Sequence, residues 1–170
     1  MAATMLLLTT FASCKKGDTG AAGVDGNANV HGTTGTIFTS NWLWNAAAQV
    51  NYVDFTDNDI TESIVDNGTV SVFISTDIYT INPIWIALPY TVWANPSFNY
   101  GFNYTYEKLE VTLSTTSHAS VTPSGTIYVK IVAIAASTIR KHPHTDWNNY
   151  EQIKATLGNE LIETTATLKH

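Results

Sequence analysis

The sequence predicts a mainly β protein, an antiparallel β-sandwich with one short internal helix and a C-terminal helix. The chain is rich in Val, Ile, Thr, Tyr and Trp, and β-branched and aromatic residues favour strands over helices. Short apolar or alternating runs recur with turn residues between them, which is typical of antiparallel sheets. Strands and helices do not alternate as they do in a parallel α/β sheet, so that class is excluded.

The composition fits one folded domain with extensions. The chain has 170 residues, of which 44% are hydrophobic and 13% charged. It is therefore too apolar for a disordered chain and too polar for a protein with several membrane spans. The net charge is −6 and no basic patch is visible, so nucleic acid is not an expected partner. A single cysteine excludes a disulfide bond within the chain.

Several segments have the pattern of strands. They are 36–38, 49–55, 69–75, 84–89, 98–106, 109–114 and 125–134. Residues 98–106 alternate strictly, so the aromatic side chains at even positions share one face, which we expect to pack in the core. In 109–114 the apolar phase moves to odd positions, and a turn or bulge at Glu107 and Lys108 has to absorb the shift.

The short internal helix is expected within residues 59–68. Thr61 is the predicted N-cap, because its hydroxyl can accept a hydrogen bond from the first turn. Glu62 stands in the first turn, where the helix dipole favours a negative charge. Gly68 is the predicted stop.

The C-terminal helix is expected over residues 146–158. Asp146 is the predicted cap and Gly158 the predicted end. Apolar side chains recur at helical spacing and form one face, which we expect to dock on the sandwich. That face comprises Trp147, Tyr150, Ile153 or Lys154, and Leu157.

The lone cysteine follows a short apolar run. Residues 5–11 are "MLLLTTF", and the small residues Ala12 and Ser13 stand directly before Cys14. The run is too short to span a bilayer and has the length of the apolar region of a secretory signal. The order resembles a bacterial lipobox, which implies cleavage before Cys14 and acylation of Cys14. The alternative is a buried N-terminal helix. No Lys or Arg precedes the run, so the placement of the start Met stays open.

Glycine recurs at every third residue behind the cysteine. It occupies positions Gly17, Gly20, Gly23 and Gly26, and Gly32 and Gly35 fall on the same count after a break at Asn29. A collagen triple helix needs this spacing but also favours proline, and residues 17–35 contain none. We therefore expect a flexible tether, with a trimeric collagen-like surface assembly as the alternative.

The expected organisation is a signal peptide at 1–13, a lipidated Cys and Gly-x-y tether at 14–29, a β-sandwich domain with its C-terminal helix at 30–158, and a tail at 159–170. Several stretches support this order: "GVDGNANV", "DITESIVDNGTVSVF", "WIALPY" and "GTIYVKIVAI". Together they resemble the collagen-like lipoproteins of Bacteroidetes-type bacteria, from Cys14 to about Gly158. The resemblance implies an anchor and a β domain, and it implies no activity and no site residues.

A metal site is one alternative function. His142 and His144 stand two residues apart, so on an extended segment both rings point to one side, and Asp146 follows. Imidazole and carboxylate suit Zn²⁺, and such a site would make the protein a metal-dependent enzyme. The sequence shows no further strong ligand nearby and no nucleophile elbow, phosphate loop or dinucleotide fingerprint. Asp57 and Asp59 lack the spacing of a Ca²⁺ loop and are expected in a solvated turn.

One cluster of aromatic residues offers a possible binding surface. It comprises Tyr79, Trp85, Tyr90, Trp93, Phe98, Tyr100, Phe102, Tyr104 and Tyr106. Sugars stack on exposed aromatic rings, but aromatic rings also fill sandwich cores. Trp93 stands close to a proline in an expected loop, and it is therefore the predicted exposed ligand-binding residue.

These observations together predict a non-enzymatic binding or structural module without a cofactor. It is anchored by lipid in the bacterial cell envelope, with the outer membrane as the expected site and the leaflet left open. Its partner is an unknown protein or glycan.

Overall fold

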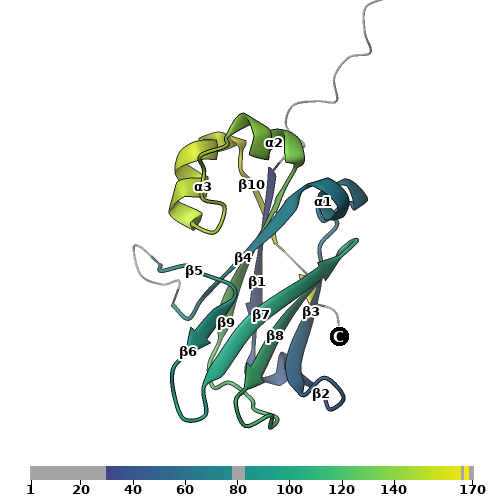
Figure 1. The fold of residues 1–170 in the computed structure, drawn as a ribbon, viewed down its shortest axis with the longest axis vertical. Coiled ribbons are helices and arrows are strands. Elements are labelled where there is room, and N and C mark those ends of the chain that lie inside the picture. The colour runs from purple at the N-terminus through teal and green to yellow at the C-terminus, as the bar shows by residue number, and fades with distance from the viewer. Residues whose placement is uncertain (1–29, 78–82, 166, 169–170) are drawn as a thin grey trace, which may run out of the picture.

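The computed structural model describes residues 30–77, 83–165 and 167–168. The predicted signal peptide at 1–13, Cys14 and the tether at 14–29 lie outside the described residues, as does Tyr79. The described strands form two facing sheets, which confirms the predicted mainly β sandwich (Figure 1).

The first sheet has the strand order β10–β1–β9–β4–β5. Its strands are β1 (Val30–Ile37), β4 (Thr69–Ser75), β5 (Ile86–Ala87), β9 (Ile127–Ile134) and β10 (Ile162–Thr165). Neighbouring strands are antiparallel except for β1 and β10, which run parallel. The predicted strand at 69–75 matches β4, whereas only two residues of the predicted strand at 84–89 pair as β5.

The second sheet has the order β11–β3–β8–β7–β6, and β2 also pairs with β3. Its strands are β2 (Leu43–Asn45), β3 (Val50–Thr56), β6 (Tyr90–Val92), β7 (Phe98–Thr105), β8 (Lys108–Thr115) and β11 (Thr167–Leu168). The phase shift predicted at Glu107 and Lys108 occurs one residue earlier. Tyr106 and Glu107 connect β7 to β8 as a two-residue turn, and Glu107 has a φ of 57°.

The inner core lies between the sheets. It includes Phe55 from β3, Val72 from β4, Val111 from β8 and Ile131 from β9. Of the aromatic face predicted on 98–106, the middle residues pack against this core while partly exposed. Tyr106 at its end lies exposed in the turn, because the strand ends before it.

A second apolar cluster lies on the outer face of the first sheet, and we call it the outer cluster. Its buried residues are Val30, Phe73, Val132, Ile134, Tyr150, Ile153 and Leu157. The last three come from α3 (Tyr150–Leu157), so this helix docks on the sheet through the face that the helical spacing predicts. Lys154 is exposed, and Ile153 occupies the buried position.

The short internal helix is α1 (Glu62–Asn67), and its predicted ends are confirmed. The hydroxyl of Thr61 accepts a hydrogen bond from the Ile64 N–H at 3.3 Å. Gly68 ends the helix with a φ of −94°, so it is not there for a left-handed backbone. A Cβ at position 68 would lie 2.4 Å from the carbonyl oxygen of Ile134, and this close approach requires glycine.

The start of the C-terminal helix differs from the prediction. Asn149, not Asp146, is the N-cap of α3, and its Oδ1 accepts a hydrogen bond from the Gln152 N–H at 3.1 Å. Asp146 instead closes a turn, in which its Oδ1 accepts from the Asn148 N–H at 3.0 Å. Gly158 ends the helix with a φ of 51°, as predicted.

Two other regions also differ from the prediction. A further helix, α2 (Ala136–Lys141), follows β9, and short 3₁₀ turns occupy Thr39–Asn41 and Gly158–Glu160. Residues 159–170 were predicted to be a tail, yet β10 and β11 lie within them and extend both sheets. The three helices lie toward one end of the sandwich, where β1 begins, and the loop between β6 and β7 lies at the opposite end (Figure 1).

Gly32 and Gly35 lie in β1, within the domain that the sequence predicts from residue 30. Replacing Gly35 by alanine should destabilise the protein by about 1–3 kcal/mol, which is the usual cost of overpacking a filled core. A Cβ at this position would lie 2.5 Å from Cε1 of Phe55, a fully buried ring. Urea unfolding measures the difference in free energy.

The control for this experiment is Gly32→Ala in the same strand. The nearest atom to its new Cβ is the terminal methyl group Cδ1 of Leu161 at 3.2 Å, which can shift. A smaller loss of stability is therefore expected. Equal losses in the two variants would contradict the packing role of Gly35.

Candidate functional site

Residues 83–86 separate two pockets on the protein surface. Pro83, Ile84 and Trp85 line one pocket against α3, while Ile84 and Ile86 line a groove between the edges of the two sheets. Successive side chains of an extended segment point to opposite faces. Trp85 accordingly packs against the outer cluster and Ile86 against the inner core.

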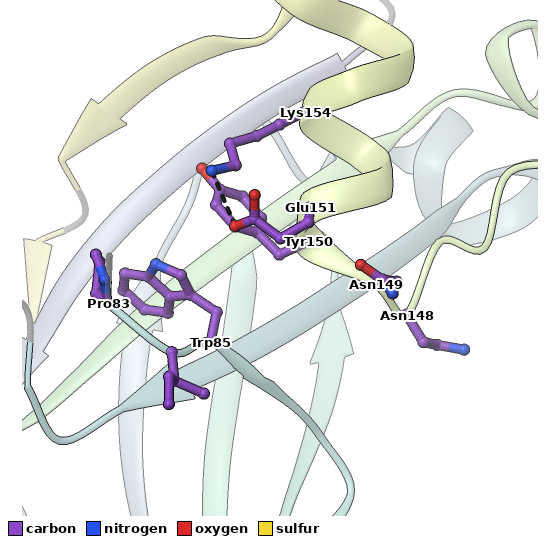
Figure 2. Close-up of a pocket in the computed structure, with 8 residues that line it drawn as sticks. Pro83, Trp85, Asn148, Asn149, Tyr150, Glu151 and Lys154 are labelled. Carbon is purple, nitrogen blue, oxygen red and sulfur yellow. Dashed lines mark ion pairs between the residues drawn. The ribbon is translucent and has the colours of Figure 1, made fainter. Parts of the chain in front are cut away.

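We call the first of these the α3 pocket. It is lined by Pro83, Ile84, Trp85, Asn148, Asn149, Tyr150, Glu151 and Lys154 (Figure 2). Its volume is about 520 Å³, within the range of pockets that bind small molecules. One wall comes from the segment before β5 and the other from the first turns of α3, so the pocket forms only when the helix is docked.

Two aromatic rings form the apolar part of the α3 pocket. The ring centroids of Trp85 and Tyr150 are 5.9 Å apart with planes inclined by 59°. Tyr150 is held from beneath by Phe73 of β4, with a centroid distance of 5.5 Å. The helix and the sheet thus fix the aromatic pair in one arrangement, and Trp85 remains partly exposed to the pocket.

A polar network lies beside these rings. Lys130 of β9 donates from Nζ to the Tyr150 hydroxyl and to Oε1 of Glu163, both at 2.5 Å. The Tyr150 hydroxyl donates to the same Glu163 oxygen at 2.6 Å. Nζ of Lys130 also lies 4.4 Å from the ring centroid of Tyr150 and 5.1 Å from that of Trp85.

These contacts shift the pKa values of Glu163 and Tyr150. The hydrogen bond from Lys130, followed by the one from Tyr150, lowers the pKa of Glu163 below its usual 4.5. Burial raises the pKa of Tyr150, and the hydrogen bond to Glu163 and the nearby carboxylates raise it further. The carboxylate of Glu163 therefore balances the ammonium of Lys130, and the tyrosine hydroxyl stays protonated at neutral pH.

The rim of the α3 pocket carries amides and one ion pair. Glu151 and Lys154 pair with each other at 2.9 Å, as the dashed line in Figure 2 shows. Asn149 uses its side-chain oxygen to cap α3, while the side chain of Asn148 is exposed beside it. The rim thus offers hydrogen-bonding groups, and its two charges are matched.

We call the second pocket the edge groove. It has a volume of about 520 Å³ and is mostly apolar. Its lining comprises Ile74, Ser75, Thr76, Asp77, Ile84, Ile86, Tyr90, Val92, Tyr100 and Ile127. The sandwich is open here because β5 and β6 are short and leave the space between the sheet edges uncovered.

Trp93, the predicted ligand-binding residue, directly follows Val92 of this groove. It lies in the loop between β6 and β7 and is 87% exposed, in agreement with the loop position expected from the sequence. Trp93 is not among the residues that line the groove or the α3 pocket. Its binding role stays a prediction.

The predicted metal ligands lie elsewhere. His142 and His144 line a shallow pocket of about 430 Å³ between the end of α2 and α3. Asp146 is engaged with the Asn148 N–H. Nowhere in residues 30–77, 83–165 and 167–168 do three or more His, Cys, Asp or Glu side chains gather in a way that could hold a metal ion.

The acidic pair at 57 and 59 is not the solvated turn expected from the sequence. Asp57 is buried, its Oδ1 accepts from the Asp59 N–H at 3.0 Å, and its Oδ2 has no hydrogen-bond partner. Burial raises the pKa of Asp57 as a result. Oδ1 of Asp59 lies 3.3 Å from Nδ1 of His31.

The sequence reasoning missed the α3 pocket. It placed Trp85 in the aromatic cluster that offered a binding surface, but it singled out only Trp93 there and did not single out Asn148 or Glu151. The run from Trp147 to Glu151, aromatic and amide residues at the start of a helix, is the local signal that could have been noticed. This run lies beside Trp85 only because α3 docks next to the segment before β5, which is distant in the sequence.

Comparisons of the chain with known protein families, with curated proteins and with solved structures give no significant match. The resemblance to collagen-like lipoproteins stays a prediction. Within the part of the chain that the structure describes, no helix has the length and apolar character needed to cross a membrane.

Glu163→Gln should change how the free energy of unfolding depends on pH. Because the pKa of Glu163 is lowered in the folded protein, its contribution is fully present above its usual 4.5 and is lost as the pH falls through the folded value. The wild-type free energy of unfolding should therefore fall more steeply below about pH 4.5 than that of the variant. Urea unfolding at a series of pH values measures both curves.

Two features make that comparison specific. The raised pKa of Asp57 acts in the opposite direction, but it is present in both proteins and cancels in their difference. Glu160→Gln removes an exposed pair with Lys141 at 3.7 Å and should leave the wild-type curve unchanged. Parallel curves for wild type and Glu163→Gln would show that the network does not stabilise the fold.

The edge groove should bind an uncharged fluorescent probe such as N-phenyl-1-naphthylamine, because it is apolar and open to solvent. Val92→Lys should weaken binding by placing a charge in the groove. Val65→Lys on α1 is the matched control, since Val92 is 39% and Val65 37% exposed. Fluorescence titration of the Cys14→Ser chain carrying each change measures this, and equal curves would place the probe elsewhere.

Proposed function

We propose that this chain is a lipid-anchored binding module of a bacterial cell envelope, without catalytic activity of its own. The observation that carries the binding role is the α3 pocket, which combines a fixed aromatic pair with exposed amides in a volume of about 520 Å³. The anchor rests on the sequence around Cys14 and on the glycine-rich spacer behind it.

The chemistry of the pocket favours binding over catalysis. The raised pKa of Tyr150 keeps its hydroxyl neutral, so it is not a nucleophile or a base at neutral pH. Lys130 donates to Tyr150 and Glu163, and Lys154 pairs with Glu151, so both amines are engaged in charge pairs. Lys130, Tyr150 and Glu163 hold the pocket in shape, and its rim is left to contact a ligand.

The arrangement of the domain suits an anchored module. β1 begins at the end of the sandwich where the helices lie, so a tether to the membrane would join there (Figure 1). The Trp93 loop lies at the opposite end and would face away from the membrane. The segment 83–86 lies between these ends with a pocket on each of its faces.

Cys14→Ser should abolish membrane attachment and leave the domain folded. The acyl chains on Cys14 would supply the attachment, at about 0.8 kcal/mol per buried CH₂ group. Palmitate labelling and partition into a detergent phase should both be lost, while the far-UV circular dichroism of the domain is unchanged. Mass spectrometry of the mature N-terminus decides the matter, and an unmodified Cys14 in a chain that retains residues 5–13 would overturn the anchor.

A further inference from the structure

The α3 pocket has a chemistry that narrows the class of its ligand. Trp85 provides a partly exposed aromatic surface, and Glu151 provides a carboxylate on the same side of the pocket (Figure 2). Asn148 provides an exposed amide farther along the rim, where its side chain extends away from Trp85. A purely apolar ligand would cover these polar groups without replacing their hydrogen bonds to water, which is costly. The ligand must therefore present both an apolar face and several hydrogen-bonding groups.

The charges of the pocket indicate that this ligand is neutral. Glu151 and Lys154 are paired with each other at 2.9 Å, and Lys130 is paired with Glu163 at 2.5 Å. Lys130 is only 14% exposed and cannot turn toward a ligand without leaving Glu163 and Tyr150. The lining cation Lys154 is balanced by Glu151 beside it, so the lining has no net positive charge to attract a nucleotide or another phosphorylated ligand.

A sugar ring meets both requirements. One face of a pyranose carries C–H groups that stack on an aromatic ring, and its edge carries hydroxyl groups that donate and accept hydrogen bonds. We propose that the α3 pocket binds a short neutral saccharide, with Trp85 as the stacking surface of one ring, Glu151 as the hydrogen-bonding partner of its hydroxyls, and Asn148, farther along the rim, as a partner of a neighbouring ring. This inference rests on the binding role proposed above and assigns its ligand class.

The position of Trp85 supports this assignment. Its ring is held by Tyr150 at 5.9 Å and by the ammonium of Lys130 at 5.1 Å, so it cannot rotate freely. A fixed ring loses little conformational entropy on binding, whereas the exposed Trp93 would have to be ordered by its ligand. Trp85, rather than Trp93, is therefore the binding tryptophan for this ligand.

The test is a titration of the full chain in detergent solution with short neutral oligosaccharides of glucose, mannose, galactose, xylose and N-acetylglucosamine. Tryptophan fluorescence and isothermal calorimetry measure binding. At least one sugar should bind, and Trp85→Ala should lower its affinity about tenfold, as expected for loss of an aromatic contact. Raising the salt concentration should leave the affinity unchanged, because the ligand is neutral.

Two further variants separate binding from folding. Asn148 is exposed, so Asn148→Ala should weaken sugar binding several-fold while leaving the urea unfolding curve unchanged. Trp44→Ala is the matched tryptophan control, since this ring is 37% exposed on β2 and does not line the α3 pocket. It should bind sugar like the wild type.

The inference is overturned if no sugar of the panel binds, or if binding survives both Trp85→Ala and Asn148→Ala. It is also overturned if sulfated or uronic-acid oligosaccharides bind more tightly than neutral ones and lose affinity with salt. Detergent partition and palmitate labelling of the same protein report on the anchor separately. An anchored chain that binds no sugar overturns the ligand class alone, and a sugar-binding chain without an acyl group overturns the anchor alone.

Discussion

The outer face of the first sheet carries a cluster of large apolar side chains, and the need to cover it organises the rest of the domain. Antiparallel sandwiches commonly leave the outer face of each sheet to solvent. Here β4 is buried along almost its whole length, and β9 adds Val132 and Ile134 to the outer side. Burial of such side chains contributes about 25 cal/mol for each Å² removed from water, so a covering element is strongly favoured. α3 provides it.

Covering this face also encloses a charge. Lys130 lies on the outer side of β9 and becomes largely buried under Tyr150, and a buried ammonium is unfavourable unless it is paired. Glu163 of β10 supplies the partner, because β10 runs parallel to β1 at the edge of the same sheet. Gly32 of β1 is the register partner of Glu163, and because it has no side chain it leaves room for Glu163 beside it. β10 is thus linked to β9 by an ion pair.

The α3 pocket follows from how this helix begins. α3 starts at Tyr150, and the residues before it form a turn closed by Asp146. Trp85, from the segment before β5, occupies part of the space beside this turn, and the unfilled part of that space is the pocket. A site of this origin has a rigid apolar floor and a polar rim, because its floor belongs to the outer cluster and its rim to a solvated helix start. The saccharide class proposed for it uses both parts.

The sequence by itself determined the features that depend on near neighbours. Strand β4, the cap at Thr61, the helix end at Gly158 and the phase shift between β7 and β8 all follow from residue patterns a few positions long, since alternation, capping and turns are local interactions. The sequence also carries the case for a lipid anchor at Cys14, which lies outside the described residues.

Only the tertiary structure decided the features that join distant segments. Two capping side chains, Asp146 and Asn149, compete within one stretch, and the docked position of α3 selects the second. β10 carries little local strand signal and forms because the edge of β1 offers backbone partners. Gly35 is required by the ring of Phe55, and the α3 pocket by the meeting of Trp85 with Tyr150. Each depends on packing between residues far apart in the chain, which no local pattern records.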